Sequence, residues 1–403
     1  MRNTKAVEMF YQGVLSMQQI RMNLEKHMRK LCLDIGSRHC GSAGEAAAAE
    51  YLYDVFKSYG YDPVFEKYKT RGWEFKSFYL YNVTENRPVP DSLACFFSNA
   101  VDIEGKLFWL TTADVSHLED FDVENKICMV ECWSGMQNVS GRNHIAEILD
   151  SKGAAAAIFI SNIHTSFAPS SKIERSPHLK KLGVCAVSQN GAFDLARHKN
   201  DTYRIKIDAR CFDHESCNVV ASRPGRGGVG VFGAHYDTAP LTQGAGDNAT
   251  GTAIVLELAR LLKEEPSGMK LDFVEFSAEE YIPEFLPPGS EDYIRRRKSG
   301  DIKWLMNYDD FGLLIGEPVI KVGLKDKLPK FSSQRYPVFE ASSYDGDDKS
   351  FCNNGVPSIW YYDRNPFSVL HTSCDSLDTV DLDKMTNGVI DSLDVFKQLA
   401  GVK

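Results

Sequence analysis

The sequence predicts an α/β fold, in which an open sheet carries helices on both faces and a smaller unit occupies the middle of the chain. From about residue 215 onward, apolar strand-like runs alternate with amphipathic helical segments, which is the pattern of such a sheet. Between about residues 91 and 209, the expected strands are short and turns are frequent. This change indicates an inserted or separate small domain.

The N-terminal part is expected to be mainly helical. Residues 5–31 repeat apolar side chains at helical spacing. A second helix is predicted over about 46–59, because Gly60 follows where a left-handed C-cap belongs. The aromatic run 78–83 predicts a strand, and the polar stretch 86–90, which contains two prolines, indicates a boundary.

The middle of the chain carries fewer signals. Residues 127–130 and 156–160 are apolar and predict strands. A helix is expected over about 145–152, with Gly153 leading into the next strand. Residues 166–176 are rich in serine, and we expect a surface loop there.

The C-terminal part supplies the strand–helix alternation. Strands are expected at 229–234, 271–276, 302–307 and 356–361, and helices at 252–262, 291–298 and 382–399. The sequence contains no internal repeat and no low-complexity tract, so repeat architectures are excluded.

Composition is that of an ordinary globular protein, with 43% hydrophobic and 25% charged residues among 403. The formal net charge of -9 argues against a nucleic-acid binder and against an anionic membrane surface. No run approaches the ~20 apolar residues of a membrane span, and no signal-peptide core follows the charged N-terminus. Ten cysteines without a CxxC pair are typical of reduced thiols, so we expect a cytoplasmic protein.

Residues able to bind a metal recur where the predicted strands end. They are His235 and Asp237, Asp247 and Asn248, Glu279 and Glu280, Asp309 and Asp310, and His371 and Asp375. Taken singly, each has an ordinary explanation, such as a structural histidine, a solvated helix start or an N-cap. However, open α/β sheets bind ligands outside the carboxyl ends of their strands, and five separate loops lead to that one edge. The set as a whole therefore predicts a functional site.

The residue types fit a pair of divalent metal ions. Zinc takes imidazole nitrogen and carboxylate oxygen, and two metals that share one carboxylate lie about 3.5–4 Å apart. We expect His235 and Asp309 to bind one metal, and Glu280 and His371 to bind the other. Asp247 would bridge the two ions. Three carboxylates and one bound hydroxide then balance the charge of two divalent cations.

Two further acids have expected roles beside these ligands. Asp237, two residues after His235, is expected to accept the ring N–H of the ligand histidine and to fix its tautomer. Glu279 is expected to act as general base on a metal-bound water whose pKa is lowered towards ~7. The predicted reaction is amide hydrolysis through a tetrahedral intermediate. The sequence has no GxSxG elbow, which disfavours serine hydrolase chemistry.

These motifs resemble those of the co-catalytic zinc aminopeptidases of metallopeptidase family twenty-eight. In the family's order they are GAHYDT (233–238), GAGDNATG (244–251), SAEEY (277–281), NYDDFG (307–312) and LHTSCDSLD (370–378). The segment 36–52 is similar to the family's entry segment as well. The resemblance implies a mixed, mostly parallel sheet sandwiched by helices, the zinc exopeptidase fold, acting on peptides. It implies two divalent metal ions, zinc foremost, on His235, Asp247, Glu280, Asp309 and His371, with Asp247 as bridge, Glu279 as base and Asp237 as the partner of His235.

The middle segment resembles the protease-associated domain that is often inserted in these enzymes. The similar text is VENKICMVECWSG (123–135) and AEILDSKGAAAAIFISN (146–162). The resemblance implies a catalytic domain formed by residues 1–89 and 210–403, and a small β-rich inserted domain over residues 90–209.

The sequence departs from the family pattern at several positions. Gly246 stands where many relatives have a second acid, and Asp348 stands where relatives usually carry histidine. Leu370 precedes the last ligand where some relatives have tyrosine, so the residue that stabilises the oxyanion is left open. The candidates are Tyr344, Tyr361 and Tyr362.

Three functions are weighed, of which an aminopeptidase is favoured. A carboxypeptidase or other amidohydrolase could use the same metals, but it needs a cation for the terminal carboxylate, usually arginine. No motif places one of the candidate arginines in the site; these are Arg295, Arg296, Arg297, Arg335 and Arg364. The third alternative is an inactive binding protein. The native metal (zinc, cobalt or manganese), the side-chain preference and the oligomeric state, a homo-oligomer included, are left open.

Overall fold

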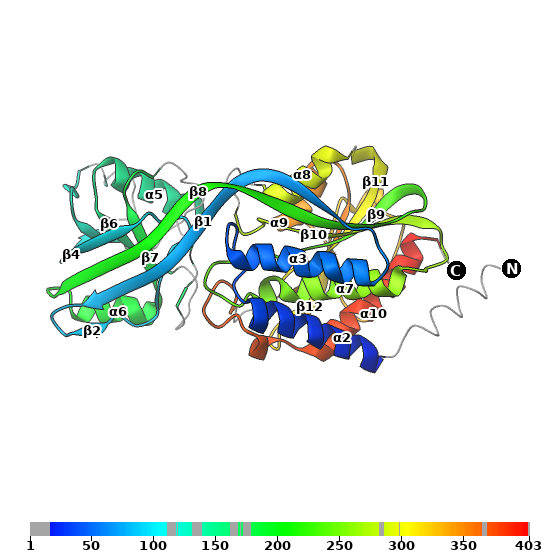
Figure 1. Ribbon diagram of the computed structural model, residues 1–403, viewed down its shortest axis with the longest axis horizontal. Coiled ribbons are helices and arrows are strands. Elements are labelled where there is room, and N and C mark those ends of the chain that lie inside the picture. The colour runs from blue at the N-terminus through cyan, green and yellow to red at the C-terminus, as the bar shows by residue number, and fades with distance from the viewer. Residues whose placement is uncertain are drawn as a thin grey trace.

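The structure, a computed structural model, consists of two lobes that lie side by side (Figure 1). The structure describes residues 17–110, 118, 120–130, 139–161, 168–169, 171, 179–281, 286–297, 299–364 and 369–401. The first part of the expected helix 5–31 and most of the expected loop 166–176 lie outside these ranges.

The larger lobe, which we call the main lobe, is built on a mixed and mostly parallel sheet. In spatial order its strands are β13 (Val338–Glu340), β12 (Glu317–Gly323), β14 (Ser358–Arg364), β11 (Ile302–Tyr308), β9 (Arg226–His235), β10 (Met269–Phe276) and β8 (Thr202–Arg223). The central strands β14, β11, β9 and β10 are parallel, whereas β12 and β8 run antiparallel to their neighbours β14 and β10. The predicted fold class is confirmed.

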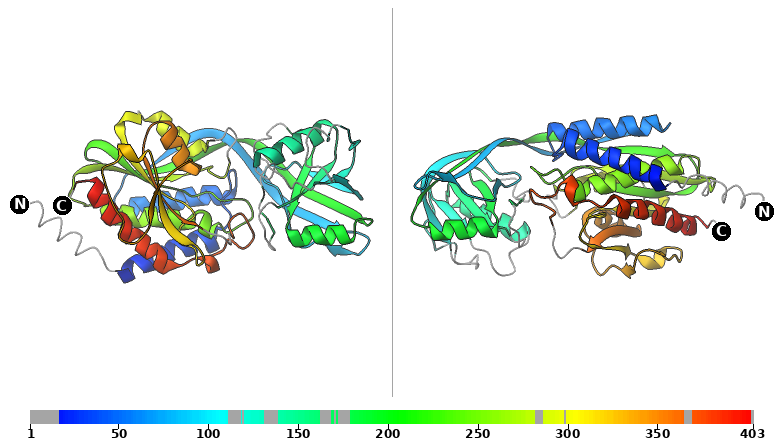
Figure 2. Two further views of the ribbon diagram at one scale, coloured as in Figure 1. Left: turned by 180° about the vertical axis from the view of Figure 1, so that it is seen from behind. Right: turned by 90° about the horizontal axis from the view of Figure 1, so that it is seen from below.

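Helices cover both faces of this sheet, as the alternation predicted. One face carries α2 (Met17–Arg29), continued by the π-helical turn η1 (Lys30–Ile35), and α3 (Ala43–Ser58), α7 (Thr250–Leu262) and α10 (Leu382–Leu399). The other face carries α8 (Pro288–Arg296) and α9 (Gly346–Asn353) (Figure 2). The Ser42 side chain caps α3 by accepting from the Glu45 amide, and Gly60 follows the helix with a left-handed φ of 81°, as expected.

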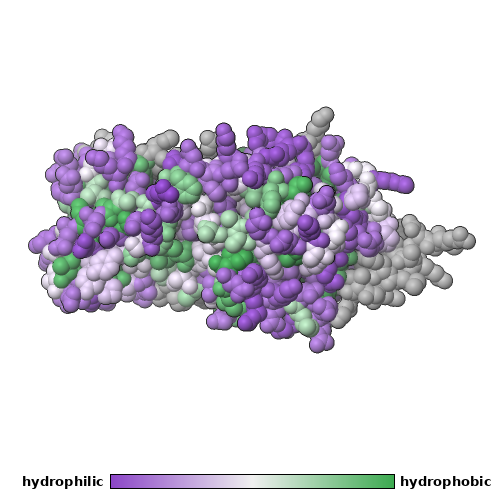
Figure 3. Space-filling view, in the orientation of Figure 1, coloured by the Kyte–Doolittle hydropathy of each residue, from purple (hydrophilic) through white to green (hydrophobic). Residues whose placement is uncertain are grey.

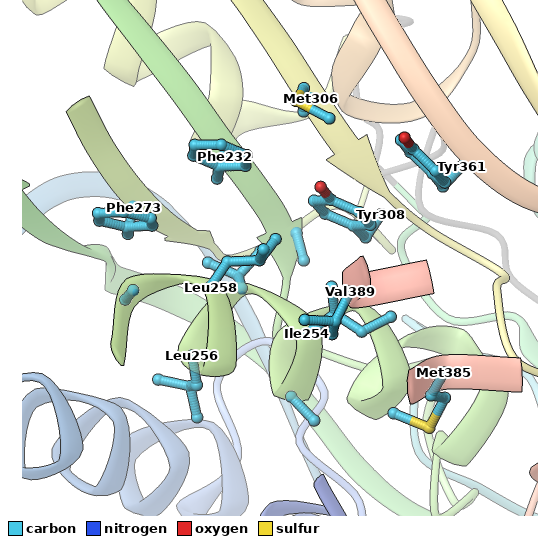
Figure 4. Close-up of a cluster of buried hydrophobic side chains, with 14 of the residues drawn as sticks. Phe232, Ile254, Leu256, Leu258, Phe273, Met306, Tyr308, Tyr361, Met385 and Val389 are labelled. Atoms are coloured by element: carbon cyan, nitrogen blue, oxygen red, sulfur yellow. The ribbon is translucent and has the colours of Figure 1, made fainter. Parts of the chain in front are cut away.

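The side chains of β10 alternate between two hydrophobic cores, one on each face of the sheet. Leu271 and Phe273 point into the core beneath α7, while Val274 and Phe276 belong to the core beneath α8. In the first core, the rings of Phe232 and Phe273 stack with centroids 5.4 Å apart (Figure 4). Burying each such side chain contributes roughly 1.5–3 kcal/mol, which fixes the strand ends that carry the site.

The smaller lobe, which we call the insert lobe, continues the sheet. Its parallel strands are β4 (Val101–Leu110), β5 (Ile127–Val130), β6 (Ala156–Ile160) and β7 (Gly183–Val187), with β3 (Ser92–Ala94) antiparallel to β7. Helices α5 (Val139–Ser151) and α6 (Gln189–Arg197) pack in the same lobe (Figure 1). Its hydrophobic core is a separate cluster of buried side chains.

A long two-stranded ribbon joins the lobes. It consists of β8 and the antiparallel β1 (Val64–Asn82), which pair from Val64 with Val220 to Asn82 with Tyr203 (Figure 2). The sequence predicted only the end of β1 and short strands in this region, so the length of the ribbon is a correction. Its central stretch is polar and partly exposed where it crosses between the lobes, which interrupts the apolar alternation used for the prediction.

The remaining elements are short. They are β2 (Arg87–Pro88), η2 (Ala245–Ala249), η3 (Ser299–Asp301), η4 (Lys325–Lys327) and η5 (Leu377–Thr379). Hydrophilic residues cover much of the face seen in Figure 3. Among the helices that the structure describes, none combines the length and the apolar character needed to cross a bilayer.

Candidate metal centre

Five acids and imidazoles from separate loops meet at the carboxyl ends of the central strands. His235 is the last residue of β9, Glu280 follows β10, Asp309 follows β11 and His371 lies after β14. Asp247 lies in η2, directly before α7. The structure thus brings together all five side chains that the sequence predicted as ligands.

The five residues form two triads that share Asp247. One triad is His235, Asp247 and Asp309, and the other is Asp247, Glu280 and His371; within each, the donor atoms lie within 4.8 Å of one another. His235 Nε2 lies 3.1 Å from an oxygen of Asp247 and 3.1 Å from one of Asp309. His371 Nε2 lies 2.8 Å from Asp247 and 3.1 Å from Glu280.

Asp247 faces the two triads with different oxygens. Its Oδ1 lies towards His235 and its Oδ2 towards His371, which is the arrangement of a carboxylate that bridges two ions. Its backbone is held by Asp375, whose carboxylate accepts from the amides of Gly246 (2.7 Å) and Asp247 (3.2 Å). The sequence placed Asp375 near the site but gave it no role.

Asp237 lies behind His235 and is fully buried. Its Oδ1 is 3.4 Å from His235 Nδ1, and its main-chain oxygen is 3.1 Å from the same nitrogen. The carboxylate also accepts from the amides of Glu279 (3.0 Å) and Glu280 (3.1 Å). One side chain therefore orients both the imidazole and the backbone of the glutamate pair.

Glu279 is buried, with 9% of its surface exposed, and its carboxylate lies beside that of Asp309. It follows Ala278, whose φ of 59° turns the chain sharply at the end of β10. The start of α9 passes close by, since a Cβ on Gly346 would lie 3.3 Å from Glu279 Oε1 and 3.4 Å from Asp309 Oδ2. Glycine at position 346 therefore lets the backbone approach both carboxylates.

Arg38 is a buried cation behind the site, and the sequence reasoning missed it. Its guanidinium donates to the main-chain oxygens of Tyr236 (2.7 Å), Gln243 (2.8 Å) and Gly244 (2.9 Å), on the loop between β9 and Asp247. Burial lowers the pKa of Arg38, while the nearby Asp375, Asp237 and Asp247 oppose that shift. The only sequence signal was an arginine within the similarity of segment 36–52 to the family's entry segment.

The electrostatics of the centre require positive charge at its middle. Burial by itself disfavours the charged form of His235, but Asp309, Asp237 and Asp247 together raise its pKa well above the ordinary value. Burial likewise opposes ionisation of Asp247, yet contacts with His235 and His371 hold its pKa well below the ordinary value. A proton on His235 thus supplies part of the positive charge that two divalent cations would bring, so the donor set fits a metal pair.

Two other acids, both in α9, have raised pKa values. Burial raises the pKa of Asp347 to about 7 and that of Asp348 to about 7. Asp348, which stands where relatives usually carry histidine, accepts from the Ser358 hydroxyl at 3.3 Å. It therefore belongs to the packing of α9 on β14.

Of the three tyrosines considered for the oxyanion, Tyr361 lies elsewhere. Its hydroxyl donates to Asp391 at 3.0 Å within the core beneath α10. The Tyr362 ring packs against Trp360 with centroids 4.9 Å apart. Tyr344 is half-buried, and its ring lies near Gly323 at the end of β12, because a Cβ on Gly323 would lie 3.0 Å from Tyr344 Cε1.

A third group of metal-type residues, Cys40, Glu45 and His214, has a structural explanation. Glu45 accepts from the Ser216 (2.5 Å) and Ser277 (2.7 Å) hydroxyls and lies 2.9 Å from His214 Nε2. Burial raises the pKa of the Cys40 thiol well above its ordinary value, which disfavours the thiolate that zinc needs. Glu45 instead ties the start of α3 to β8 and to the loop that precedes Glu279.

Comparison with known proteins finds a matching family model and individual relatives. Residues 218–389 match the model of Peptidase family M28. Aminopeptidase YwaD of Bacillus subtilis is 27% identical over 181 residues, which are 42% of this chain and 37% of that protein. The probable lipoprotein aminopeptidase LpqL of Mycobacterium tuberculosis is 23% identical over 359 residues, 80% of this chain and 69% of that one. The match to YwaD therefore spans little more than a third of that relative.

Solved structures share the fold over nearly the whole chain. A peptidase M28 precursor from Shewanella amazonensis superposes with a TM-score of 0.78 at 20% identity, covering 99% of this chain and 96% of that one. The zinc aminopeptidase BSAP of Bacillus subtilis gives a TM-score of 0.74 at 18% identity, covering 94% of each chain.

Proposed function

We propose that this chain is a dinuclear zinc aminopeptidase of peptidase family M28, whose model matches residues 218–389, and that it hydrolyses the N-terminal bond of peptides. One observation carries the proposal. Asp247 presents its two oxygens to two different imidazoles, each of which belongs to a triad of metal-type donors. Two of the proteins to which the chain is similar are named aminopeptidases, and BSAP is named a zinc aminopeptidase.

In this proposal the ligands are assigned to two ions. His235 and Asp309 would hold one ion, Glu280 and His371 would hold the other, and Asp247 would be shared by both. Such a pair of cations would lower the pKa of the attacking water towards ~7 and polarise the scissile carbonyl.

Glu279 is assigned as the general base. A Cβ on Gly346 would lie within 3.4 Å of carboxylate oxygens of both Glu279 and the ligand Asp309, so Glu279 lies beside the site, where its carboxylate can accept a proton from the attacking water and pass it to the leaving amine. Asp237 supports the reaction from behind, because it fixes His235 and the amides of Glu279 and Glu280. Neither role needs a covalent intermediate on the enzyme.

The arginines considered for a carboxypeptidase are engaged away from the site. Arg295 and Arg296 both pair with Asp292, and Arg297 pairs with Glu66 at 2.8 Å. Arg335 pairs with Asp394 at 3.2 Å and Arg364 with Glu317 at 2.8 Å. These contacts favour an aminopeptidase over a carboxypeptidase, which would need a free arginine to bind the terminal carboxylate.

The domain division is also a proposal. Residues 1–89 and 210–403 would form the catalytic domain, and residues 90–209 a domain of the protease-associated type. The separate buried core of the insert lobe supports this division. That core also takes in Trp73 and Leu80 of β1, so the ribbon is shared by both units.

We further propose a reducing, cytoplasmic compartment. Six of the nine cysteines that the structure describes are buried, which is typical of unreactive structural thiols. Fractionation of cells that express a tagged chain tests this, and recovery of the protein outside the cytoplasm would contradict it.

One experiment tests the function. The purified protein is analysed for metals and assayed with a panel of aminoacyl substrates that carry free or N-acetylated amines. We expect two zinc ions per chain and cleavage of the free-amine substrates alone. His371→Ala should lose activity and one zinc ion, whereas His214→Ala, a control from the third residue group, should keep both. Cleavage confined to acetylated substrates would contradict an aminopeptidase.

A further inference from the structure

The two triads differ in what supports them. His235 and Asp309 are supported by the core of the main lobe. That core contains their neighbours in the chain, which are Ala234, Tyr236 and Tyr308. By contrast, the residues on either side of the Glu279–Glu280 pair, Ala278 and Tyr281, belong to the buried cluster of the insert lobe. The metal position of His235 and Asp309 is therefore built on the core of the main lobe. Glu280, a ligand of the other position, lies on a loop anchored in the core of the insert lobe.

The anchor of the Glu280 loop is an aromatic contact. The rings of Tyr281 and Phe97 have centroids 4.7 Å apart, and both side chains are 4% exposed. Phe97 in turn packs against Phe96 with centroids 4.3 Å apart. Aromatic pairs of this kind contribute beyond their buried area, so they fix the direction in which the loop leaves β10.

The His371 loop is held by the same lobe through its backbone. Pro169 of the insert lobe forms an antiparallel bridge with Thr372, and the amide of Ser373 donates to the oxygen of Ala168 at 2.9 Å. His371 itself has a φ of 53°, a backbone conformation that side-chain-bearing residues seldom adopt. Such a conformation persists only where surrounding contacts hold it.

The two contacts form one unit. The Phe96 amide donates to the oxygen of Ser171 at 2.8 Å, which ties the aromatic contact to the segment that bridges Thr372. Arg142 of α5 fixes that segment from behind, since its Nη1 donates to the Ser171 hydroxyl at 3.1 Å. We call this unit the clamp, defined by Phe96, Phe97, Ala168, Pro169 and Ser171.

We propose that the clamp sets the affinity of the metal position formed by Glu280 and His371 and affects the position formed by His235 and Asp309 much less, through Asp237, which couples that second position to the clamped loop. The inference rests on the proposed dinuclear site. It makes Phe97 and Tyr281 positioning residues, which act through the two ligand loops without touching metal or substrate. The His371 side chain is 35% exposed and that of His235 is 1% exposed, so the clamped position is also the one that we expect to lose its ion first.

The test measures zinc binding to metal-free protein by calorimetry in two single-site backgrounds. His235→Ala leaves the position of Glu280 and His371, and His371→Ala leaves the position of His235 and Asp309. Phe97→Ala should lower the zinc affinity by about 10-fold or more in the first background, which is the usual effect of losing a residue that orients a ligand. In the second background it should change the affinity by less than about 3-fold, since no ligand-orienting contact is lost there.

Three variants serve as controls. Phe97→Leu keeps an apolar side chain and should recover much of the affinity. Phe108→Ala removes a different ring from the same core, the partner of Phe121 at 6.0 Å, and should leave both affinities unchanged. Should Phe97→Ala fail to fold, Arg142→Gln loosens the clamp from its other side and should give the same selective loss.

Equal losses in both backgrounds, or no loss in either, would overturn the inference and leave the dinuclear site standing. A wild-type protein that takes up fewer than two zinc ions would overturn the proposed site itself, and the inference with it.

Discussion

At the scale of single residues, the centre is defined by how a few side chains divide their contacts. Asp247 uses one oxygen for each triad, and Asp237 serves an imidazole and two amides at once. Arg38 supplies a buried positive charge and binds the loop that connects His235 to Asp247. Each of these groups is fully engaged, so Glu279, which is not assigned as a ligand, is the carboxylate that we propose exchanges protons with substrate and water.

Replacing Glu279 with glutamine tests this assignment. Glutamine preserves the shape of the side chain but cannot accept the proton, so kcat should fall by about 10²–10⁴-fold. Zinc content, measured by metal analysis, should stay at two ions per chain, because Glu279 is not assigned as a ligand.

Glu50→Gln, on the exposed side of α3, is the matched control and should retain normal turnover. A Glu279→Gln enzyme that kept most of its activity would show that another group is the base.

At the scale of elements, the packing of α2 on α3 contains a buried titratable group. His27 of α2 lies with its ring nitrogens 2.7 Å from the Tyr51 hydroxyl and 3.1 Å from the Tyr59 hydroxyl. Burial, with smaller effects from Lys26 and Arg260, lowers the pKa of His27 to about 3. The native protein therefore holds this imidazole neutral at pH values where the unfolded chain would protonate it.

This pKa predicts how stability depends on pH. The unfolded histidine titrates near ~6.5, so the contribution of neutral His27 is fully present above that pH and is lost as the pH falls towards ~3. Between pH 7 and pH 5 the loss should reach about 2 kcal/mol. His27→Gln should remove this component, which urea unfolding of the metal-free protein at the two pH values would measure.

His144→Gln is the control, because the His144 side chain is 60% exposed. It should show the same pH dependence as the wild type. If His27→Gln also lost as much stability as the wild type between pH 7 and pH 5, the neutral buried state of His27 would be contradicted.

At the scale of the whole molecule, the centre ties together elements that are distant in the chain. Its ligands come from loops after β9, β10, β11 and β14 and from the start of α7. The clamp adds contacts from the insert lobe, and the β1–β8 ribbon joins the two lobes covalently (Figure 1). Metal binding should therefore stabilise the arrangement of both lobes as well as the local site.

Removal of the metals should lower the melting temperature. Without cations, the carboxylates of Asp247, Glu280 and Asp309 crowd one site and repel each other. A metal present at about 1,000 times its Kd stabilises the native state by about 4 kcal/mol, and chelation removes this contribution. Thermal melts before and after treatment with a chelator measure the shift.

A variant without both histidine ligands, His235→Ala with His371→Ala, should melt at a temperature that the chelator hardly changes. An unchanged melting curve of the wild-type protein, after its metal loss has been verified, would contradict a stabilising metal centre.

The local sequence pattern predicted many of the strands and helices, the fold class and the set of residues at the site. Strands such as 127–130 and 156–160, and the helix at 382–399, lie where apolar periodicity predicted them, because such periodicity reports which face of an element is buried. The alternation of strands and helices predicted the fold class. The acids and imidazoles at strand ends predicted the set of residues that meet at one edge, because parallel strands deliver their carboxyl ends to the same side of the sheet.

Only the tertiary structure decided what surrounds that set. Arg38 reaches carbonyl groups about 200 positions further along the chain, and Asp375 accepts from amides that precede it by well over a hundred. The length of the ribbon, the sharing of Asp237 and the contact of Phe97 with Tyr281 likewise depend on residues far apart in sequence. Periodicity records burial but not the partner against which a side chain is buried. The assignment of each ligand loop to one core or the other could therefore be made only once the chain was folded.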